Sequence, residues 1–183
     1  MTDALPVAAG EAGDRPAARV LVLGCGNLLA GDDGVGPEVV RRLTEAGLPP
    51  DVKAVDGGTL GLDLLPLLDG QDLLVLVDAV DATRLRPQAS PPAAGTVSLW
   101  EGAAVARAFA VPLSVHEVAV ADLLGAAMLA GRLPAEVALV GVQPHTLEPG
   151  VGLSPDVNAA VPAAMALVGE VVAGRPATPP GSA

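Results

Sequence analysis

Cysteine, lysine and aromatic residues are almost absent from this chain of 183 residues, and each shortage excludes a class of protein. Cys25 is the only cysteine, so an internal disulfide and a C-x-x-C metal or redox motif are both excluded. The only lysine, Lys53, does not lie in a glycine-rich P-loop. Since the aromatic residues are limited to Trp100 and Phe109, valine, leucine and alanine must form the core.

Positive charge is also scarce. Ten basic residues against 21 acidic ones give a formal net charge of −11 at pH 7, which argues against nucleic acid or an anionic membrane as the main partner. The longest apolar stretch, residues 159–169, contains Pro162, so we expect no membrane span. The first 17 residues have no apolar core of a signal peptide, and together with the single cysteine this predicts a cytoplasmic protein.

Length and pattern predict one α/β domain. The chain is long enough for one well-buried domain. Residues 1–18 and 174–183 are rich in alanine, proline and glycine and are predicted to be disordered, which leaves a domain over residues 19–173. Apolar runs alternate with helical patterns, which predicts three layers and a largely parallel sheet. The expected strands cover 19–23, 52–55, 73–77, 96–99 and 137–142, and the expected helices cover 34–46, 59–68, 114–130 and a segment beginning at 155. Thr59 and Ser154 are the expected N-caps of the second and fourth helices, and Gly131 is expected to end the third.

A glycine-rich turn follows the first predicted strand and leads to two adjacent carboxylates, Asp32 and Asp33. The glycines allow positive φ and a close approach of backbone segments. Pro37 is compatible with a helix only in its first turn, so the two carboxylates are expected at the start of that helix. In open α/β sheets, ligands bind at this carboxyl edge of the strands.

Two further residues with metal-binding side chains are expected at the same edge. Asp78 ends the third strand, and His116 lies in the capping-box sequence Ser114–Glu117 at the start of a helix. Together with Asp33 they offer two carboxylates and a neutral imidazole, a set that suits a divalent transition ion. Simpler interpretations remain open, namely a helix N-cap or first-turn acid for Asp33, a turn cap for Asp78 and an ordinary surface histidine for His116.

Two other kinds of site can be formed from nearby residues. The Gly24-x-Gly26 pair with Asp56 after the second strand matches part of a dinucleotide fingerprint, but Leu29 replaces its third glycine. Adjacent carboxylates would also repel a pyrophosphate. Cys25 activated by a histidine would be a nucleophile, although a cysteine between two glycines more often only fills a tight space.

The ordered motifs resemble the nickel–iron hydrogenase maturation endopeptidases. The resemblance covers roughly residues 19–172 and implies an αβα sandwich with a mostly parallel sheet of about five strands. It also implies an enzyme that removes a short C-terminal extension from the hydrogenase large-subunit precursor after nickel insertion. The matching segments are Gly24–Gly36, Asp56–Thr59, Val77–Ala79, Ser114–Glu117, Gly141–Pro144 and Leu153–Ser154.

The resemblance also implies the roles of the site residues. Asp33, Asp78 and His116 would be the metal-binding and catalytic residues, and the metal would be nickel carried by the substrate. Relatives often have glutamate where this chain has Asp33, which changes the reach of the carboxylate but not the ligand type. His145 matches no family motif and is expected in a loop. Supporting roles fall on Gly24, Gly26, Asn27, Asp32 and Asp56.

Three alternatives to this function stay open. The isolated enzyme could hold another divalent transition metal of its own, for example zinc, and act on small peptides. The chain could also be a dinucleotide-binding module without enzymatic activity, or a module that binds the precursor without cutting it.

Overall fold

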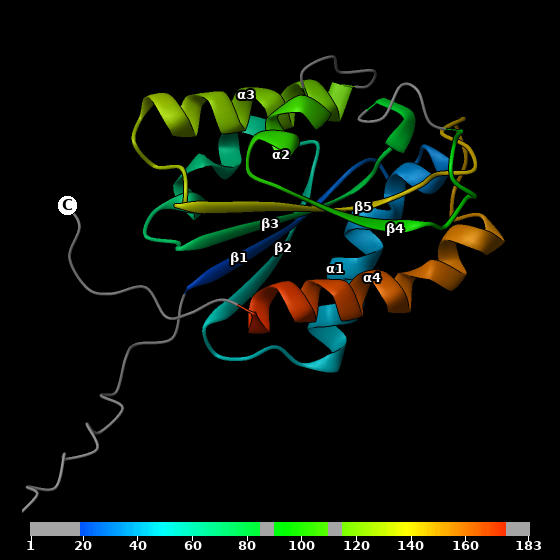
Figure 1. Cartoon of the computed structure of the whole chain (residues 1–183), viewed down its shortest axis with the longest axis horizontal. Coiled ribbons are helices and arrows are strands. Elements are labelled where there is room, and N and C mark those ends of the chain that lie inside the picture. The colour runs from blue at the N-terminus through cyan, green and yellow to red at the C-terminus, as the bar shows by residue number, and fades with distance from the viewer. Residues whose placement is uncertain (1–18, 85–89, 110–114, 175–183) are drawn as a thin grey trace, which may run out of the picture.

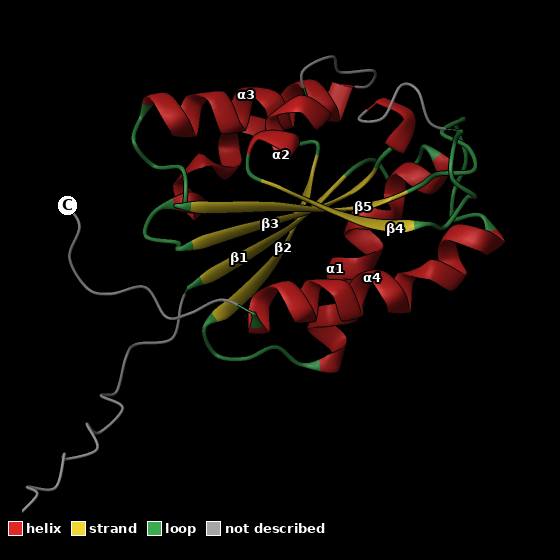
Figure 2. Cartoon of the chain, viewed as in Figure 1, coloured by secondary structure: helices red, strands yellow, loops and turns green. Residues whose placement is uncertain are grey.

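The computed structural model of this protein is a five-stranded sheet with helices on both faces (Figures 1 and 2). It describes residues 19–84, 90–109 and 115–174. The predictions of disorder for 1–18 and 174–183 therefore fall outside the described residues, except at Gly174, which is the C-cap of the last helix. The strands are β1 (Val20–Cys25), β2 (Val52–Gly58), β3 (Leu73–Ala79), β4 (Val97–Glu101) and β5 (Glu136–Val142). The helices are α1 (Val35–Ala46), α2 (Ala103–Ala108), α3 (Val115–Leu129) and α4 (Pro155–Ala173), with 3-10 helices η1 (Gly31–Gly34), η2 (Gly61–Leu68) and η3 (Ala82–Arg84).

The sheet has the strand order β2-β1-β3-β5-β4. β2, β1, β3 and β5 are parallel, and β4 pairs antiparallel with β5 at one edge. The prediction of a mostly parallel sheet of about five strands is therefore confirmed. Four strands end at the same edge of the sheet, and the chain leaves β1 between two parallel neighbours, which is where α/β sheets bind ligands.

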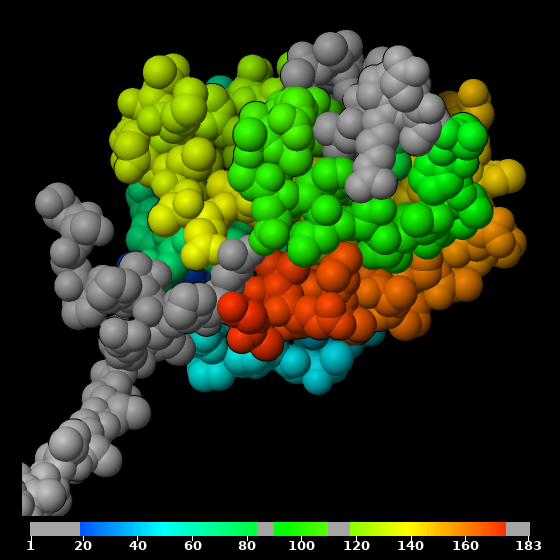
Figure 3. Space-filling view, viewed as in Figure 1, coloured from blue at the N-terminus to red at the C-terminus, as the bar shows by residue number. Residues whose placement is uncertain are grey.

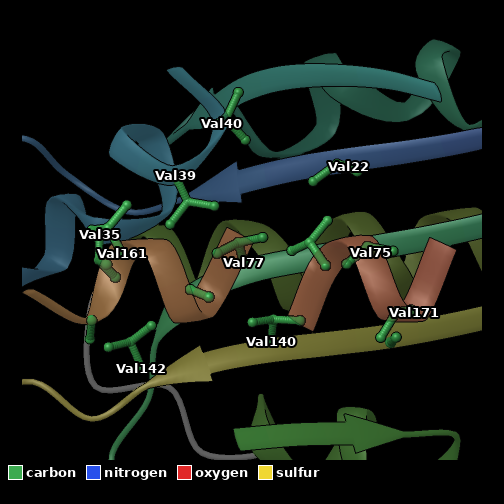
Figure 4. Packing of buried hydrophobic residues seen from close by; sticks show 14 of the residues in the cluster. Val22, Val35, Val39, Val40, Val75, Val77, Val140, Val142, Val161 and Val171 are labelled. Atoms are coloured by element: carbon green, nitrogen blue, oxygen red, sulfur yellow. The ribbon is translucent and has the colours of Figure 1, made fainter. Parts of the chain in front are cut away.

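Valine and leucine alternate along the central strands and separate the core into two halves. Val22 and Val75 face α1 and α4, as Figure 4 shows, whereas Leu23 and Leu76 face η2, α2 and α3. This alternation follows from the two-residue period of a strand. Each face of the sheet is thus buried by helices, which is the predicted αβα sandwich.

α4 is long and apolar enough to cross a membrane by length and composition alone. In the fold it lies along the sheet next to the edge strand β4 (Figure 3). Its buried side chains, Val157, Val161 and Val168 among them, belong to the same core cluster as the valines of β3 and β5. Burial against the sheet therefore accounts for the apolar character of this helix.

The start of α4 and the end of α3 follow the sequence signals. Ser154 is the N-cap of α4, with Pro155 directly after it, as predicted. Gly131 has a φ of +65° after α3, and the amide of Arg132 donates to the carbonyl of Ala127 at 2.8 Å, as expected of a glycine that ends a helix. The predicted capping by Ser114 lies outside the described residues.

The prediction of Thr59 as the N-cap of a helix is wrong. β2 continues to Gly58, and Leu60 occupies the N-cap position of η2. Gly58 and Gly61 have positive φ values of 43° and 53° and turn the chain sharply between these two elements. Pro66 lies inside η2 and lacks an amide donor, which is consistent with a short 3-10 helix rather than an α-helix.

Candidate active site

The glycines after β1 bring the start of α1 directly against the end of the sheet. A Cβ atom on Gly36 would clash with the carbonyl oxygens of Cys25 and Val77, and one on Gly24 would clash with the carbonyl oxygen of Gly36. Gly26 has a φ of +122°, and a Cβ atom there would clash with the carbonyl oxygen of Asp33. The three glycines therefore allow Asp33 to lie beside the end of β1.

Asp33 is buried, with 5% of its surface exposed, and accepts a hydrogen bond from the amide of Asn27 at 2.9 Å on Oδ2. Gly34, not Asp33, occupies the N-cap position of α1, so the N-cap interpretation of Asp33 is wrong. Asp33 does lie in the first turn of the short helix η1, which is the other simple interpretation of this residue. A phosphate at this turn would need the amide that Asp33 already binds, which argues against the dinucleotide site.

Asp78 and Asp56 lie on the two strands that flank β1. Gly24 pairs with Asp56 on one side and with Val77, the neighbour of Asp78, on the other. Asp78 is 1% exposed, and its Oδ1 accepts a hydrogen bond from the amide of Ala79 at 2.8 Å. Asp56 is exposed, and its Oδ1 accepts from the amide of Gly58 at 3.0 Å.

The thiol of Cys25 is buried in the apolar cluster that contains Leu23 and Leu64, and these carboxylates lie close enough to influence its charge. Burial raises its pKa well above the ordinary value, and the negative charges of Asp78, Asp56 and Asp33 raise it further. Three acidic residues from separate elements are therefore close to the end of β1. A nucleophilic cysteine needs the opposite environment, one that lowers its pKa, so the structure argues against Cys25 as a nucleophile.

His116 lies in the first turn of α3, and its side chain is outside the described residues. A Cβ atom on Gly61, at the start of η2, would lie 2.9 Å from the Cβ atom of Ala119, which is one helical turn beyond His116. The carbonyl of Gly58 in turn accepts a hydrogen bond from the amide of Gly26 at 3.3 Å. The backbone therefore brings the start of α3 toward the edge of the sheet that carries the carboxylates.

The site of Asp33, Asp78 and His116 stays a prediction. Among the described side chains of residues 19–84, 90–109 and 115–174, which do not include the imidazole of His116, no three His, Cys, Asp or Glu residues form a group that could hold a metal ion. What the arrangement offers chemically is a pair of buried carboxylates at an edge of the sheet. Carboxylate oxygens from separate elements are ligands that a divalent cation can bind.

Asp32 faces away from this centre and binds the loop between β5 and α4. It is fully buried, and its Oδ2 accepts hydrogen bonds from the amides of His145 and Thr146 at 2.8 and 3.1 Å. Ser154 donates its amide to Oδ1 at 2.6 Å and its hydroxyl to Oδ2 at 3.0 Å. The side chain of His145 is exposed, and its position in a loop is as predicted.

Hydrogen bonding decides the charge state of Asp32. Burial by itself raises the pKa of this carboxyl group, but the hydrogen bonds from Ser154, Thr146 and His145 outweigh burial and lower the pKa below its ordinary value. Asp32 is therefore a buried anion with a full set of donors. The residues next to Asp32 in the sequence give no indication of these partners, which lie more than 100 residues away.

The comparison with known proteins identifies the same family that the motifs resemble. The family model described as hydrogenase maturation protease, HycI, matches residues 37–171. The hydrogenase 2 maturation protease of Escherichia coli K12 is 36% identical over 148 residues, which is 80% of this chain and 86% of that protein. The chain belongs to the hydrogenase maturation protease family.

Solved structures of hydrogenase maturation proteases have the same fold. The E. coli endopeptidase HybD superposes with a TM-score of 0.75 and 35% identity, over 85% of this chain and 93% of that one. The [NiFe] hydrogenase maturation protease HybD from Thermococcus kodakarensis superposes with a TM-score of 0.68 and 27% identity, over 84% of this chain and 99% of that one. These matches confirm that the protein is an endopeptidase of this family.

Proposed function

We propose that this protease removes the C-terminal extension of a nickel-loaded [NiFe] hydrogenase large-subunit precursor in the cytoplasm. Nickel held by the precursor would bind Asp33, Asp78 and His116 and so anchor the substrate at the carboxyl edge of the sheet. The observation that carries the proposal is the placement of Asp33 and Asp78, two buried carboxylates from separate elements, beside Cys25.

The chemistry of these groups supports nickel as the recognised ion. Two carboxylates with little exposure repel one another, and a divalent cation brought by the substrate would neutralise them. Imidazole and carboxylate ligands both suit a first-row transition ion. Three ligands from the protein also leave coordination positions for the ligands of the precursor. A precursor without nickel would offer only a flexible tail to the same acidic edge.

Hydrolysis of the peptide bond requires a water molecule that loses a proton as it attacks the carbonyl carbon. Asp33 and Asp78 are carboxylates that can accept this proton once the precursor is anchored beside them. Asp56, exposed on the neighbouring strand, adds negative charge near the same point. The oxygen ligands and the proton acceptor thus come from one small region of the protein.

The test uses Asp33→Asn, Asp78→Asn and His116→Gln, each assayed by the size shift of a nickel-loaded precursor on a gel. We expect each variant to lose at least about 100-fold in processing rate, because a carboxylate or imidazole contributes to both anchoring and proton transfer. Asp122→Asn, on the exposed surface of α3, is the matched control and should process normally. Circular dichroism verifies that all four variants are folded.

Unimpaired processing by all three site variants would reject the assignment. Two further measurements on the same protein preparation distinguish this proposal from the alternative of a metallohydrolase that carries its own metal. Metal analysis of the purified protease should find it largely free of nickel and zinc, and a precursor without nickel should remain uncut. Stoichiometric zinc, or cleavage of the nickel-free precursor at the normal rate, would instead support the metallohydrolase.

A further inference from the structure

Two loops at the carboxyl edge of the sheet carry exposed aliphatic side chains. Leu28 and Leu29, after β1, are 54% and 66% exposed, and Leu147 and Val151, after β5, are 46% and 88% exposed. We refer to these four residues as the aliphatic platform. Large exposed apolar side chains that gather in one region mark a binding surface more often than scattered ones do.

Hydrogen bonds hold the two loops of the platform together. The amide of Gly150 donates to the carbonyl of Leu29 at 2.9 Å, and the amide of Gly31 donates to the carbonyl of Gly150 at 3.0 Å. Ala30 and Gly150 thus form a parallel β-bridge between the loops. Leu29 also donates its amide to Oδ1 of Asn27 at 2.9 Å. The exposed side chains therefore project from a connected backbone.

The buried carboxylate of Asp32 links the same pair of loops through hydrogen bonds. It lies three residues after Leu29, and its four hydrogen bonds come from residues 145, 146 and 154, at the two ends of the second loop. A buried charge with four donors resists separation, because each donor left unpaired costs free energy. The platform is consequently preorganised, which lowers the entropic cost of binding a partner.

The platform adjoins the proposed active site. Asn27, whose amide binds Oδ2 of Asp33, is the residue directly before Leu28. Leu28 also lines a pocket of about 450 Å³ along α1 that extends to Asp56. A protein substrate whose chain reaches Asp33 and Asp56 would therefore contact Leu28 at once, and the remaining platform residues as its surface extends past them.

We propose that the aliphatic platform is the docking surface for the folded body of the precursor, next to the nickel and the C-terminal extension that it presents. This inference rests on the proposed function. The matching surface of the precursor would be an apolar patch close to its nickel, because the four platform residues are aliphatic. Glu148, next to Leu147, is exposed and adds one acidic side chain to the same loop. Continuity with the carboxylate site identifies the occupant as the substrate.

A second exposed apolar pair provides a matched control. Met128 and Leu129, at the end of α3, are 65% and 88% exposed, which matches Leu29 and Val151 closely. The end of α3 leads to the start of β5 and lies at the opposite edge of the sheet (Figure 1). Loss of aliphatic surface there should not affect a partner bound at the carboxyl edge.

The experiment compares the double variant Leu29→Ser with Val151→Ser against the control Met128→Ser with Leu129→Ser. Steady-state cleavage of the nickel-loaded precursor is measured for the wild type and both variants. We expect the platform variant to raise KM about tenfold with kcat unchanged, and the control to keep both constants. A variant with Leu29→Met and Val151→Ile should restore the wild-type KM, because it restores apolar area.

Three results would overturn the docking proposal, and each is distinct. Wild-type KM in the platform variant would reject the docking surface and leave the proposed function intact. A wild-type enzyme that cuts no nickel-loaded precursor would reject the proposed function and the docking surface together. If sedimentation shows a wild-type dimer that the platform variant converts to a monomer, the platform is instead an interface between two copies of this chain.

Discussion

Asp32 and Asp33 are adjacent in the sequence but have different environments. Asp33 accepts one amide from the turn after β1 and lies near Cys25 and the other acidic residues. Asp32 accepts every hydrogen bond described above from the loop between β5 and α4. One carboxylate thus lies at the edge of the sheet with the other acidic residues, while its neighbour holds together the loops around it.

Replacement of Asp32 by asparagine should destabilise the protein strongly. The amide nitrogen of asparagine would face N–H donors that now point at a carboxylate oxygen, so at least one buried donor loses its acceptor. We expect a loss of roughly 2–4 kcal/mol in the free energy of unfolding. Urea denaturation measures this value, and Asp122→Asn, with an exposed side chain, should change it by less than about 0.5 kcal/mol.

The stabilisation by Asp32 should also depend on pH in a defined direction. Because the folded state lowers the pKa of Asp32 from its ordinary value of 3.8, the stabilisation is fully present above that value. It is lost as the pH falls through the lower pKa of the folded state. The difference in stability between the wild type and Asp32→Asn should therefore shrink below about pH 4, and a difference that stays constant into acid would contradict this account.

At the scale of elements, close contact between α1 and the ends of β1 and β3 depends on glycine. Gly24 and Gly36 allow backbone to meet backbone where any Cβ atom would clash. This contact positions Asp33 beside the end of β1, because η1, which contains Asp33, leads directly into α1. The glycines are therefore part of the site even though they have no side chain to offer it.

Gly36→Ala should destabilise the protein by more than about 2 kcal/mol, because its methyl group would have to displace the carbonyl groups of both Cys25 and Val77. Gly125→Ala is the matched control, since it also lies within a helix but has open space around it. Alanine favours helices over glycine by about 0.5–1 kcal/mol, so this control should be neutral or stabilising. Thermal unfolding compares the two, and an equal effect of both substitutions would refute the packing argument.

At the scale of the whole molecule, the excess of acidic residues opposes folding at low salt. The net charge of −11 at pH 7 produces repulsion in any compact state. At 0.1 M ionic strength, salt largely screens the repulsion between exposed charges that are more than about 10 Å apart. The midpoint of thermal unfolding should therefore rise when sodium chloride is increased from about 0.01 to 0.5 M at pH 7, by an amount equivalent to roughly 1 kcal/mol.

The control for this prediction is the same salt titration near the isoelectric point, about pH 4.3. Positive and negative charges balance there, so the increase should disappear. A salt effect of equal size at both pH values would mean that the cause is general exclusion of salt from the protein surface rather than charge repulsion.

The parts of the fold that depend on neighbouring residues could be predicted from the sequence. Apolar runs predicted all five strands, and helical spacing predicted α1, α3 and α4 with termini close to those observed. The proline and serine that begin α4 and the glycine that follows α3 act through residues within one or two turns. The prediction for Thr59 was wrong because positive φ at Gly58 and Gly61 redirects the chain before a capped helix can start.

Only the tertiary structure decided what each acidic residue does. The partners of Asp32 are 113 to 122 residues away and are mostly backbone amides, which every residue except proline possesses, so no side-chain pattern marks them. The bridge between Ala30 and Gly150, which joins the two loops of the aliphatic platform, is also formed by backbone groups and so could not be predicted from the sequence. Sequence alone determined the order of strands and helices and the approximate position of each, although β1, β2 and β3 extend two or three residues past the predicted ends. The gathering of acidic residues at the end of β1, and the separation of Asp32 from Asp33, required the strands to pair, because proximity across a sheet arises only when distant segments meet.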